Sequence, residues 1–501
     1  MSAPEVEAAI QALQAGQKGE ALRLLKLAAG AVADDPLALQ AWAVALDDPA
    51  RRIESLALLE RAVRIAPGDA QAHFNLGVNL QAIDDFPRAI AHYERALDLA
   101  PAMLGPLNNL SDLYRRRGRP EEGWALMQRY LAAGGAANGM EVRLAKLAID
   151  TRRFEESEAW FQAATKAAPN DPKVAFEHAM LALVLQDWAR GWPLYEARLQ
   201  SYGPAALAIY PYTMPAWDGE ARPGARVLLH REQGLGDMMM FAAALPAMIE
   251  AGVTPHLAMA PSLHRLFAES FPKAKVWSSI TFVGAAQQPP QRFLEVCGPI
   301  DAQAPMASLG ALRMKDGPPK PAAYLKAPAD EATRFGARME ALAPSRQGER
   351  RVGLVIGARL PRFSDDGMTN GMRKSIPAVD VEPLADVANV RWFSLHDRES
   401  AAQLADVPRA TIADLSPWIT DFADTAAAIA NLDLVVTVDT AVAHLAGAMG
   451  KPVWLMLWRN ADWRWGADRE DSVWYPQVRV FRQTRPGRWG DVVERVAAAL
   501  G

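Results

Sequence analysis

The chain has 501 residues, half of them hydrophobic and 22% charged, which is enough to bury large cores and predicts about three domains. Its formal net charge of −4 argues against general binding to nucleic acid or to anionic membranes. One cysteine, Cys297, rules out an intramolecular disulfide and a cysteine-based zinc site, and the opening MSAPEVEAAI lacks the pattern of a signal peptide. We therefore expect a cytoplasmic protein without a membrane span.

The first two hundred residues repeat with a step of 34. Pro101 follows Pro67 by 34 residues, and Pro169 follows Pro101 by 68. The clearest copy is AQAHFNLGVNLQAIDDFPRAIAHYERALDLAP, residues 70–101. Small residues such as Gly77 recur where two helices must approach closely, and larger apolar residues fill the space between them. This pattern predicts pairs of packed helices.

This copy resembles the tetratricopeptide repeat. By the same register we expect about five repeats between residues 6 and 200, which form an α-solenoid domain over residues 1–200. The resemblance implies a concave face that holds an extended protein segment. A spacer or a dimerisation arm is the alternative. The positions that match the family pattern are Leu76, Gly77, Ala89, Tyr93, Ala96 and Pro101.

The helical pattern ends in the stretch PYTMPAWDGEARP, residues 211–223, so we place a linker at 201–225. Beyond it, short apolar runs alternate with helical stretches, a pattern typical of parallel strands joined by helices. We expect two Rossmann-like lobes, one over 226–345 and a nucleotide-sugar-binding one over 346–501. Ligands of such sheets bind at the carboxyl ends of the strands.

The first candidate motif is HREQGLGDMMMF, residues 230–241, directly after an expected strand. Gly234 and Gly236 would let the backbone turn sharply and let a substrate come close. Asp237 would then begin the following helix. It could cap the N–H groups of that helix, or it could act as a general base at the mouth of a cleft.

The second motif is DTAVAHLAGAMG, which follows the expected strand at 432–439. Free amides and the positive end of a helix attract phosphate oxygens at such a position. Thr440 could add a hydroxyl donor, and His444 lies one turn later on the same face. For His444 both packing and ligand binding remain open.

A glycine-interrupted basic loop at 357–377 is the third candidate. It carries Arg359, Arg362, Arg373 and Lys374. Basic residues on a loop are usually just solvated, but opposite a phosphate-binding helix they could neutralise charge on a departing nucleotide. Because no carboxylate pair is placed to hold Mg²⁺ there, we expect no metal.

These motifs carry a family resemblance. EQGLGD, RKSIP and the long stretch from DFADTAAAIANLDLVVTVDTAVAHLAGAMG to WRNADWRWG resemble the catalytic region of bacterial glycosyltransferases with the two-lobed GT-B fold. The nearest likeness that includes tetratricopeptide repeats is to protein O-linked sugar transferases. The region is also similar to the lipopolysaccharide heptosyltransferase family. The resemblance covers nearly the whole chain and implies an α-solenoid followed by an α/β GT-B domain.

The resemblance also implies roles for single residues. Asp237 corresponds to the base of the heptosyltransferases, while Ala441 stands where that family has glycine. It implies that the nucleotide-sugar donor binds around Gly234, Gly236, Arg373, Lys374, Asp439, Thr440 and His444.

The implied activity is transfer of a sugar from a nucleotide-activated donor to Ser or Thr hydroxyls of a protein held by the repeats. Flagellin is the first acceptor candidate, because repeat-bearing relatives modify it. No cofactor is implied beyond the donor itself. Two alternatives remain: a transferase for lipopolysaccharide or another glycan, with the repeats as a tether, and a scaffold that has lost catalysis.

Overall fold

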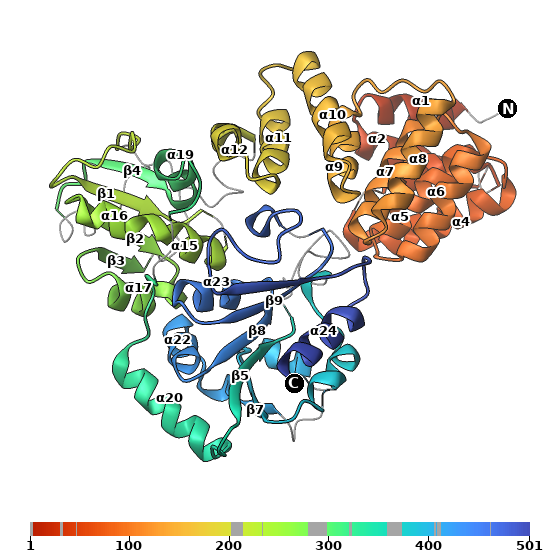
Figure 1. Cartoon of the computed structure of the whole chain (residues 1–501). Helices are drawn as coiled ribbons and strands as arrows, with labels where there is room; N and C mark the ends of the chain where they lie inside the picture. The colour runs from red at the N-terminus through yellow and green to blue at the C-terminus, as the bar shows by residue number, and fades with distance from the viewer. Residues whose placement is uncertain are drawn as a thin grey trace. The chain divides into compact units, whose positions relative to one another are not determined.

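The computed structural model describes residues 4–30, 34–46, 48–201, 214–232, 234–278, 298–319, 323–357, 373–404, 407, 412–460 and 462–501. The described residues form two compact units, shown in Figure 1. The first extends to Thr151, and the second begins at Arg152. The chain therefore divides inside the repeat region.

Helices follow one another through the repeat region, as predicted. Two-helix steps start at Ala70 and Leu104, 34 residues apart. Six such steps begin between Pro4 and Pro172, one more than expected, because divergent copies keep the helical spacing even where they lose pattern residues. The helices are α1 (Pro4–Gln14), α2 (Lys18–Leu27), α3 (Pro36–Ala45), α4 (Arg52–Ile65), α5 (Ala70–Gln81), α6 (Phe86–Leu99), α7 (Leu104–Arg116), α8 (Pro120–Ala132) and α9 (Glu141–Asp150) in the first unit, then α10 (Phe154–Ala167), α11 (Pro172–Val184), α12 (Trp188–Tyr195) and α13 (Arg198–Ser201) in the second.

Local sequence explains where these helices begin and how they pair. Asp69 caps α5, and its carboxylate accepts the N–H of Gln71 at 2.9 Å. In the α5–α6 pair a Cβ at Gly77 would lie only 2.7 Å from the ring of Tyr93. The small residue is therefore required for the close approach of the two helices, as the repeat pattern predicted.

The second unit contains two parallel sheets, which confirms the expected fold class. The first has the order β3-β2-β1-β4 and the second β10-β9-β8-β5-β6-β7. The strand order reverses between β5 and β8, a switch point of the kind at which open parallel sheets bind ligands. The strands are β1 (Arg226–His230), β2 (Thr254–Met259), β3 (Lys275–Ser278), β4 (Ala302–Pro305), β5 (Arg350–Val355), β6 (Val390–Ser394), β7 (Ile412–Asp414), β8 (Leu434–Val438), β9 (Val453–Leu457) and β10 (Val478–Arg482).

Helices cover these sheets and carry the turns that form the site. Longer ones are α15 (Leu235–Phe241), α16 (Leu245–Glu250), α17 (His264–Ser270), α19 (Leu309–Arg313), α20 (Ala329–Leu342), α22 (Phe422–Ala430), α23 (Ala441–Ala448) and α24 (Gly490–Leu500). One face of the second sheet packs against α24 in an apolar core. Fully buried members include Val352, Val436 and Val493, from β5, β8 and α24.

The last repeat helices belong structurally to the second unit. Trp192 on α12 is buried, and its Nε1–H donates to the carbonyl of Met314 at 2.8 Å. A Cβ at Gly310 on α19 would lie 2.5 Å from the Trp192 ring, so the two helices touch closely. These contacts explain why the compact units separate before α10 rather than after α13.

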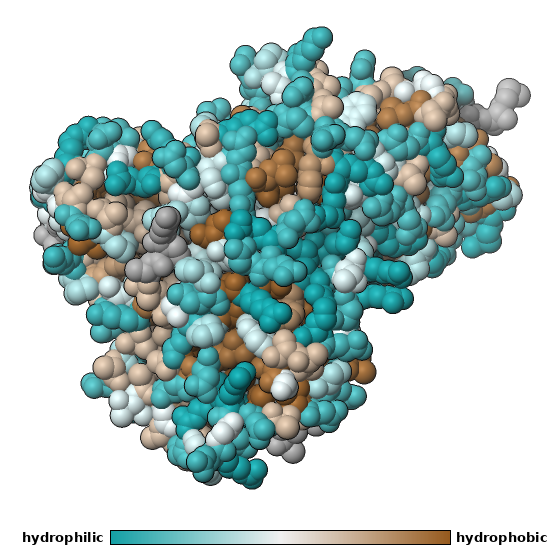
Figure 2. Space-filling model, viewed as in Figure 1, coloured by the Kyte–Doolittle hydropathy of each residue, from teal (hydrophilic) through white to brown (hydrophobic). Residues whose placement is uncertain are grey.

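The face drawn in Figure 2 is mostly hydrophilic. Among the described residues, none of the helices has both the length and the apolar character needed to cross a bilayer. The cytoplasmic location remains a prediction.

Candidate functional site

The candidate site lies where the first turns of α15 and α23 pack together. α15 follows β1 of the first sheet, and α23 follows β8 of the second, so both turns are at carboxyl ends of strands. A Cβ at Gly236 would lie 2.7 Å from Cδ2 of His444 and 3.5 Å from Cα of Ala441. Gly236 is thus required for this helix contact. Its expected role in substrate approach stays a prediction.

Gly234 is not needed for the backbone freedom that the sequence suggested. Its φ of −66° and ψ of 165° are accessible to other residues. The expectation that glycine is needed at 234 for a sharp turn of the backbone is therefore wrong. Space is the better explanation, because a Cβ at Gly234 would lie 3.1 Å from Oδ2 of Asp237. Glycine leaves this carboxylate room.

Asp237 is the third residue of α15 and has both carboxylate oxygens bound. Oδ2 accepts the N–H of Gly234 at 3.0 Å, so the side chain caps the helix. Oδ1 accepts the Nε–H of Arg464 at 2.7 Å, and a second guanidinium nitrogen contacts the same oxygen. The side chain remains 17% exposed. Asp237 is therefore not the N-cap residue that the sequence suggested: Gly234 is the N-cap, and Asp237 binds its N–H from the third helical position. The role as a general base stays a prediction.

Arg464 is the site residue that the sequence reasoning missed. It lies in the short 3₁₀ segment Trp463–Trp465, and its Nη1 binds Oδ1 of Asp462 at 2.5 Å. Although burial opposes the charged form, Asp237 and Asp462 raise the pKa of Arg464 well above its usual value. The only sequence signal was an arginine between two tryptophans, which usually indicates packing.

Lys374 and Asp439 form a second buried ion pair beside it. The Nζ of Lys374 lies 2.5 Å from Oδ2 of Asp439, and Nε1–H of Trp465 donates to Oδ1 of Asp439 at 2.8 Å. Burial disfavours both charges, yet each partner offsets this, so the pKa of Lys374 is raised and the pKa of Asp439 is lowered. Both groups are therefore ionised at neutral pH.

His444 is a packed residue in this structure. Its Nδ1 lies 3.0 Å from the hydroxyl of Tyr475, and its ring stacks on Trp465 with centroids 5.0 Å apart. Burial lowers the pKa of His444 to about 4, so the ring is neutral at neutral pH. Of the two interpretations left open by the sequence, packing is observed, and donor binding stays a prediction.

A cavity of about 290 Å³ lies at the switch point of the second sheet. Thr440, the N-cap of α23, lines it, but its side chain caps none of the helix N–H groups. Leu235 of α15 also lines the cavity, whereas Asp237, Lys374 and His444 do not. Sequence reasoning missed the polar lining that follows β6 and precedes α22. These residues are His396, Asp397, Ser400, Thr420 and Asp421.

This cavity can offer hydrogen-bond donors to an anionic ligand. The first amides of α23 and the hydroxyl of Thr440 are the groups suited to phosphate oxygens, whereas the hydroxyl of Thr420 already donates to Asp424. Asp421 already caps α22, because its carboxylate accepts the N–H groups of Ala423 and Asp424. The uncapped α23 terminus is therefore the better phosphate site.

Of the basic loop at 357–377, the structure describes only Gly357 and residues 373–377. The guanidinium of Arg373 lies 5.4 Å from the ring centroid of Trp458. Arg359 and Arg362 fall outside the described residues. Across the described part of the chain, no group of three or more His, Cys, Asp or Glu side chains is arranged to hold a metal ion. The absence of a metal requirement remains a prediction.

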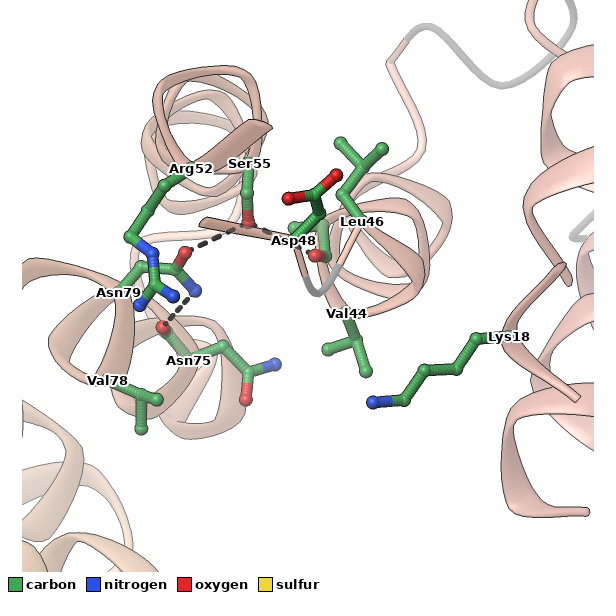
Figure 3. A pocket seen from close by; sticks show the side chains of 10 residues that line it. Lys18, Val44, Leu46, Asp48, Arg52, Ser55, Asn75, Val78 and Asn79 are labelled. Carbon is green, nitrogen blue, oxygen red and sulfur yellow. Dashed lines mark hydrogen bonds between the residues drawn. The ribbon is translucent and has the colours of Figure 1, made fainter. Parts of the chain in front are cut away.

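A separate cavity of about 260 Å³ lies among the first repeats. Lys18 of α2 and Asn75 of α5 point toward one another across it, and Arg52 of α4 lies beside Asn79 (Figure 3). The hydroxyl of Ser55 on α4 donates to Oδ1 of Asn79 on α5 at 3.0 Å, which connects the two helices at the cavity. The first unit thus has a concavity lined by apolar, amide and cationic side chains and by the carboxylate of Asp48.

Comparison with known families supports the two resemblances. The model of glycosyltransferase family 9 (heptosyltransferase) matches residues 389–462, which include β6 to β9 and the whole of α22 and α23. Tetratricopeptide-repeat models match residues 70–102 and 142–171. The first of these is the copy that the sequence singled out. Asp237 and Lys374 lie outside the glycosyltransferase match.

Two curated proteins are similar to this chain. Protein FlbA of Caulobacter vibrioides is 27% identical over 488 residues, which is 93% of this chain and 73% of that protein. Cellulose synthase operon protein C of Xanthomonas axonopodis pv. citri is 32% identical over 132 residues, which is 25% of this chain and 9% of that protein.

Among solved structures, a tetratricopeptide repeat protein from Parabacteroides merdae has a TM-score of 0.35 and 17% identity, covering 40% of this chain and 79% of that one. The tetratricopeptide protein YrrB, described as having an unusual peptide-binding site, has a TM-score of 0.31 and 14% identity, covering 35% of this chain and 91% of that one.

Proposed function

We propose, for a chain that combines tetratricopeptide repeats with a glycosyltransferase family 9 domain, that it transfers a sugar from a nucleotide-activated donor to Ser or Thr hydroxyls of a protein held by the repeats. The observation that carries this proposal is the meeting of two strand-end turns, one from each parallel sheet, beside a polar cavity at a switch point. One turn carries a carboxylate, and the other begins a helix that can bind phosphate.

The donor would bind in the cavity of the second sheet. Its phosphates would accept hydrogen bonds from the first amides of α23 and from Thr440, whose side chain leaves those amides uncapped. Lys374 would share its charge between Asp439 and the donor phosphates. In this proposal helix amides and cationic side chains stabilise the leaving phosphate, so no metal is needed.

Asp237 would accept the proton of the attacking hydroxyl. A carboxylate offers about four lone-pair directions. Here the N–H of Gly234 and two guanidinium nitrogens of Arg464 occupy three of them. One direction is left for an acceptor hydroxyl.

The acceptor would lie along the repeats. The cavity lined by Lys18, Arg52, Asn75 and Asn79 offers amide groups to a peptide backbone and cations to acidic side chains. Flagellin is the first acceptor to test, on the resemblance to repeat-bearing flagellin transferases. A glycan acceptor is the second candidate, because the matching family is described as heptosyltransferases.

Donor binding can be tested by thermal shift with CMP, UDP, GDP and ADP. At 100 times the dissociation constant, a specific ligand should stabilise the protein by about 2.7 kcal/mol. Thr440→Val should reduce the ligand-induced shift, whereas Thr333→Val, an exposed threonine on α20, should leave it unchanged. Failure of all four nucleotides to shift the wild-type protein would argue for a scaffold without catalysis.

The acceptor class can be tested with substitutions in the first unit. Lys18→Ala should raise KM for a protein acceptor and leave hydrolysis of the donor unchanged. Lys26→Ala is the matched control, since it lies on the same helix but outside the cavity lining. If both variants transfer sugar to a glycan as well as the wild type does, the glycan acceptor is favoured.

A further inference from the structure

Arg198, on the last helix of the repeat region, is a buried cation that binds the first lobe. Its Nη2 donates to Oε2 of Glu232 at 2.7 Å and to Oγ of Ser308 at 2.9 Å, and its Nε binds the other oxygen of Glu232. The two side chains are 0% and 1% exposed. A guanidinium that grips both oxygens of one carboxylate fixes orientation as well as distance.

Glu232 lies in the turn that leads to Asp237. On one side the N–H of Arg231 donates to the carbonyl of Ala258 at 3.1 Å, as part of the sheet. On the other side the N–H of Gly234 donates to Asp237 at 3.0 Å and begins α15. Between the sheet bond and the helix cap, the Glu232 side chain anchors the turn, and its partner is a repeat residue.

A second set of contacts connects the repeats to the same carboxylate. The rings of Trp192 and Tyr195 lie 5.6 Å and 6.0 Å from the ring of Trp463, measured between centroids. The guanidinium of Arg464 lies 4.5 Å from the centroid of Trp463 and binds Asp237. The last repeat helices therefore contact the supports of Asp237 on both sides, its own turn and its arginine partner.

Stability alone is a poor explanation for the buried pair. Two charges lose their hydration on burial, and well-packed apolar residues of similar volume usually stabilise a fold as well or better. A bidentate ion pair fixes the orientation of its two side chains relative to one another, and an apolar pair does not.

We propose that Arg198 is a positioning residue for Asp237. Through Glu232 it holds the turn that precedes α15, so the last repeat helix determines where the carboxylate lies. The effect on catalysis rests on the proposed function, whereas the effect on the order of the turn does not.

Hydrogen exchange on the full chain tests the structural part. Arg198→Lys keeps the positive charge but loses the bidentate hydrogen bond to the carboxylate of Glu232. Amides at 234–241 should then exchange about tenfold faster, as expected when one charged hydrogen bond is lost from a local opening. Amides of β2 should be unaffected. Arg190→Lys on α12, which pairs with Glu158, is the matched control. Unchanged exchange at 234–241, or an equal rise in β2, would overturn the proposal.

A variant in which both charges are replaced by apolar side chains tests whether the ion pair orders the turn or only fills space. The double substitution Arg198→Met with Glu232→Leu removes both fully buried charges. Glu196, which also binds Arg198, is 33% exposed and keeps the hydroxyl of Ser308 as a partner, so the protein should still fold. We expect its 234–241 amides to remain fast. If this variant protects the turn as the wild type does, Arg198 has no positioning role.

Kinetics test the catalytic part. With a transferable donor, Arg198→Lys should lower kcat about 100-fold, the usual effect of a small misplacement of a reacting group, and leave donor KM unchanged. A variant with wild-type kcat would contradict the coupling. If the wild-type protein transfers no sugar, the proposed function fails, and the exchange experiment still decides whether Arg198 orders the turn.

Discussion

The repeat helices before Thr151 and those after it share one sequence pattern but are stabilised differently. In the first unit the ion pairs of the described residues keep some exposure, as in Arg119–Glu122, at 44% and 49%, and Arg115–Asp150, at 22% and 19%. In the second unit Arg198 is fully buried, and Trp192 packs against residues of both lobes. The pattern thus determines how helices pair with each other. Residues outside the pattern determine what else they contact.

The largest expected effects come from substituting one buried tryptophan in each unit, because each substitution should destabilise only the unit that contains it. Trp192→Ala should destabilise the second unit by about 3–5 kcal/mol, because a large buried ring is lost. Trp124→Ala on α8 should have a similar effect on the first unit. Segment-resolved hydrogen exchange in urea would separate the two. If Trp192→Ala destabilises the first unit equally, the two groups of repeats do not differ as described.

Acid should affect the second unit more than the first. Burial lowers the pKa of His230, His396 and His444 to about 4, from about 6.5 in an unfolded chain. The unfolded state therefore binds protons first as pH falls. The stabilisation is complete above pH 6.5 and is lost between pH 6.5 and 4, at a cost of up to about 3 kcal/mol per histidine.

Urea midpoints measured between pH 7 and 4.5 would check this acid sensitivity. His396→Gln should make the pH dependence of the second unit shallower, whereas His264→Gln, a partly exposed histidine on α17, should not. In the first unit, burial and the nearby His73 lower the pKa of His92. In the second unit burial also lowers the pKa of His256, so the same sign is expected from one histidine in the first unit and from four in the second. Equal acid sensitivity of the two units would contradict the comparison.

The smallest expected effect concerns the helix caps that both groups of repeats share. Asp69→Ala should cost about 1 kcal/mol, because two N–H groups of α5 lose their acceptor. Asp171→Ala on α11 should cost about the same, since Asp171 accepts the N–H of Lys173 at 2.8 Å. Denaturation midpoints would measure both. A much larger loss for Asp171 would mean that this cap also supports contacts to the lobes.

Much of the fold could be predicted because its signals are local. The 34-residue step placed the repeat helices, and the change from helical to alternating patterns placed the parallel sheets. The strand-to-helix turns at Asp237 and Thr440 were also predictable from apolar runs that end in glycine or a polar residue. These features depend on neighbours within a few residues.

The partners of the charged residues could not be predicted in the same way. Lys374 and Asp439 were each expected near donor phosphates, yet they bind one another. Arg464 lies 227 residues after Asp237 in the sequence, and nothing local indicates that they pair. Such contacts depend on how the two sheets pack, which a single sequence does not specify.

The missing side chain at Gly236 has a consequence for motion. Because α15 and α23 touch where even a methyl group would clash with His444, sliding one sheet past the other at this point is blocked. Opening and closing of the two lobes would instead take place as rotation about this contact, with the largest displacements far from it. The pivot would then lie beside Asp237, so the groups nearest the proposed chemistry would move least while a ligand enters and leaves.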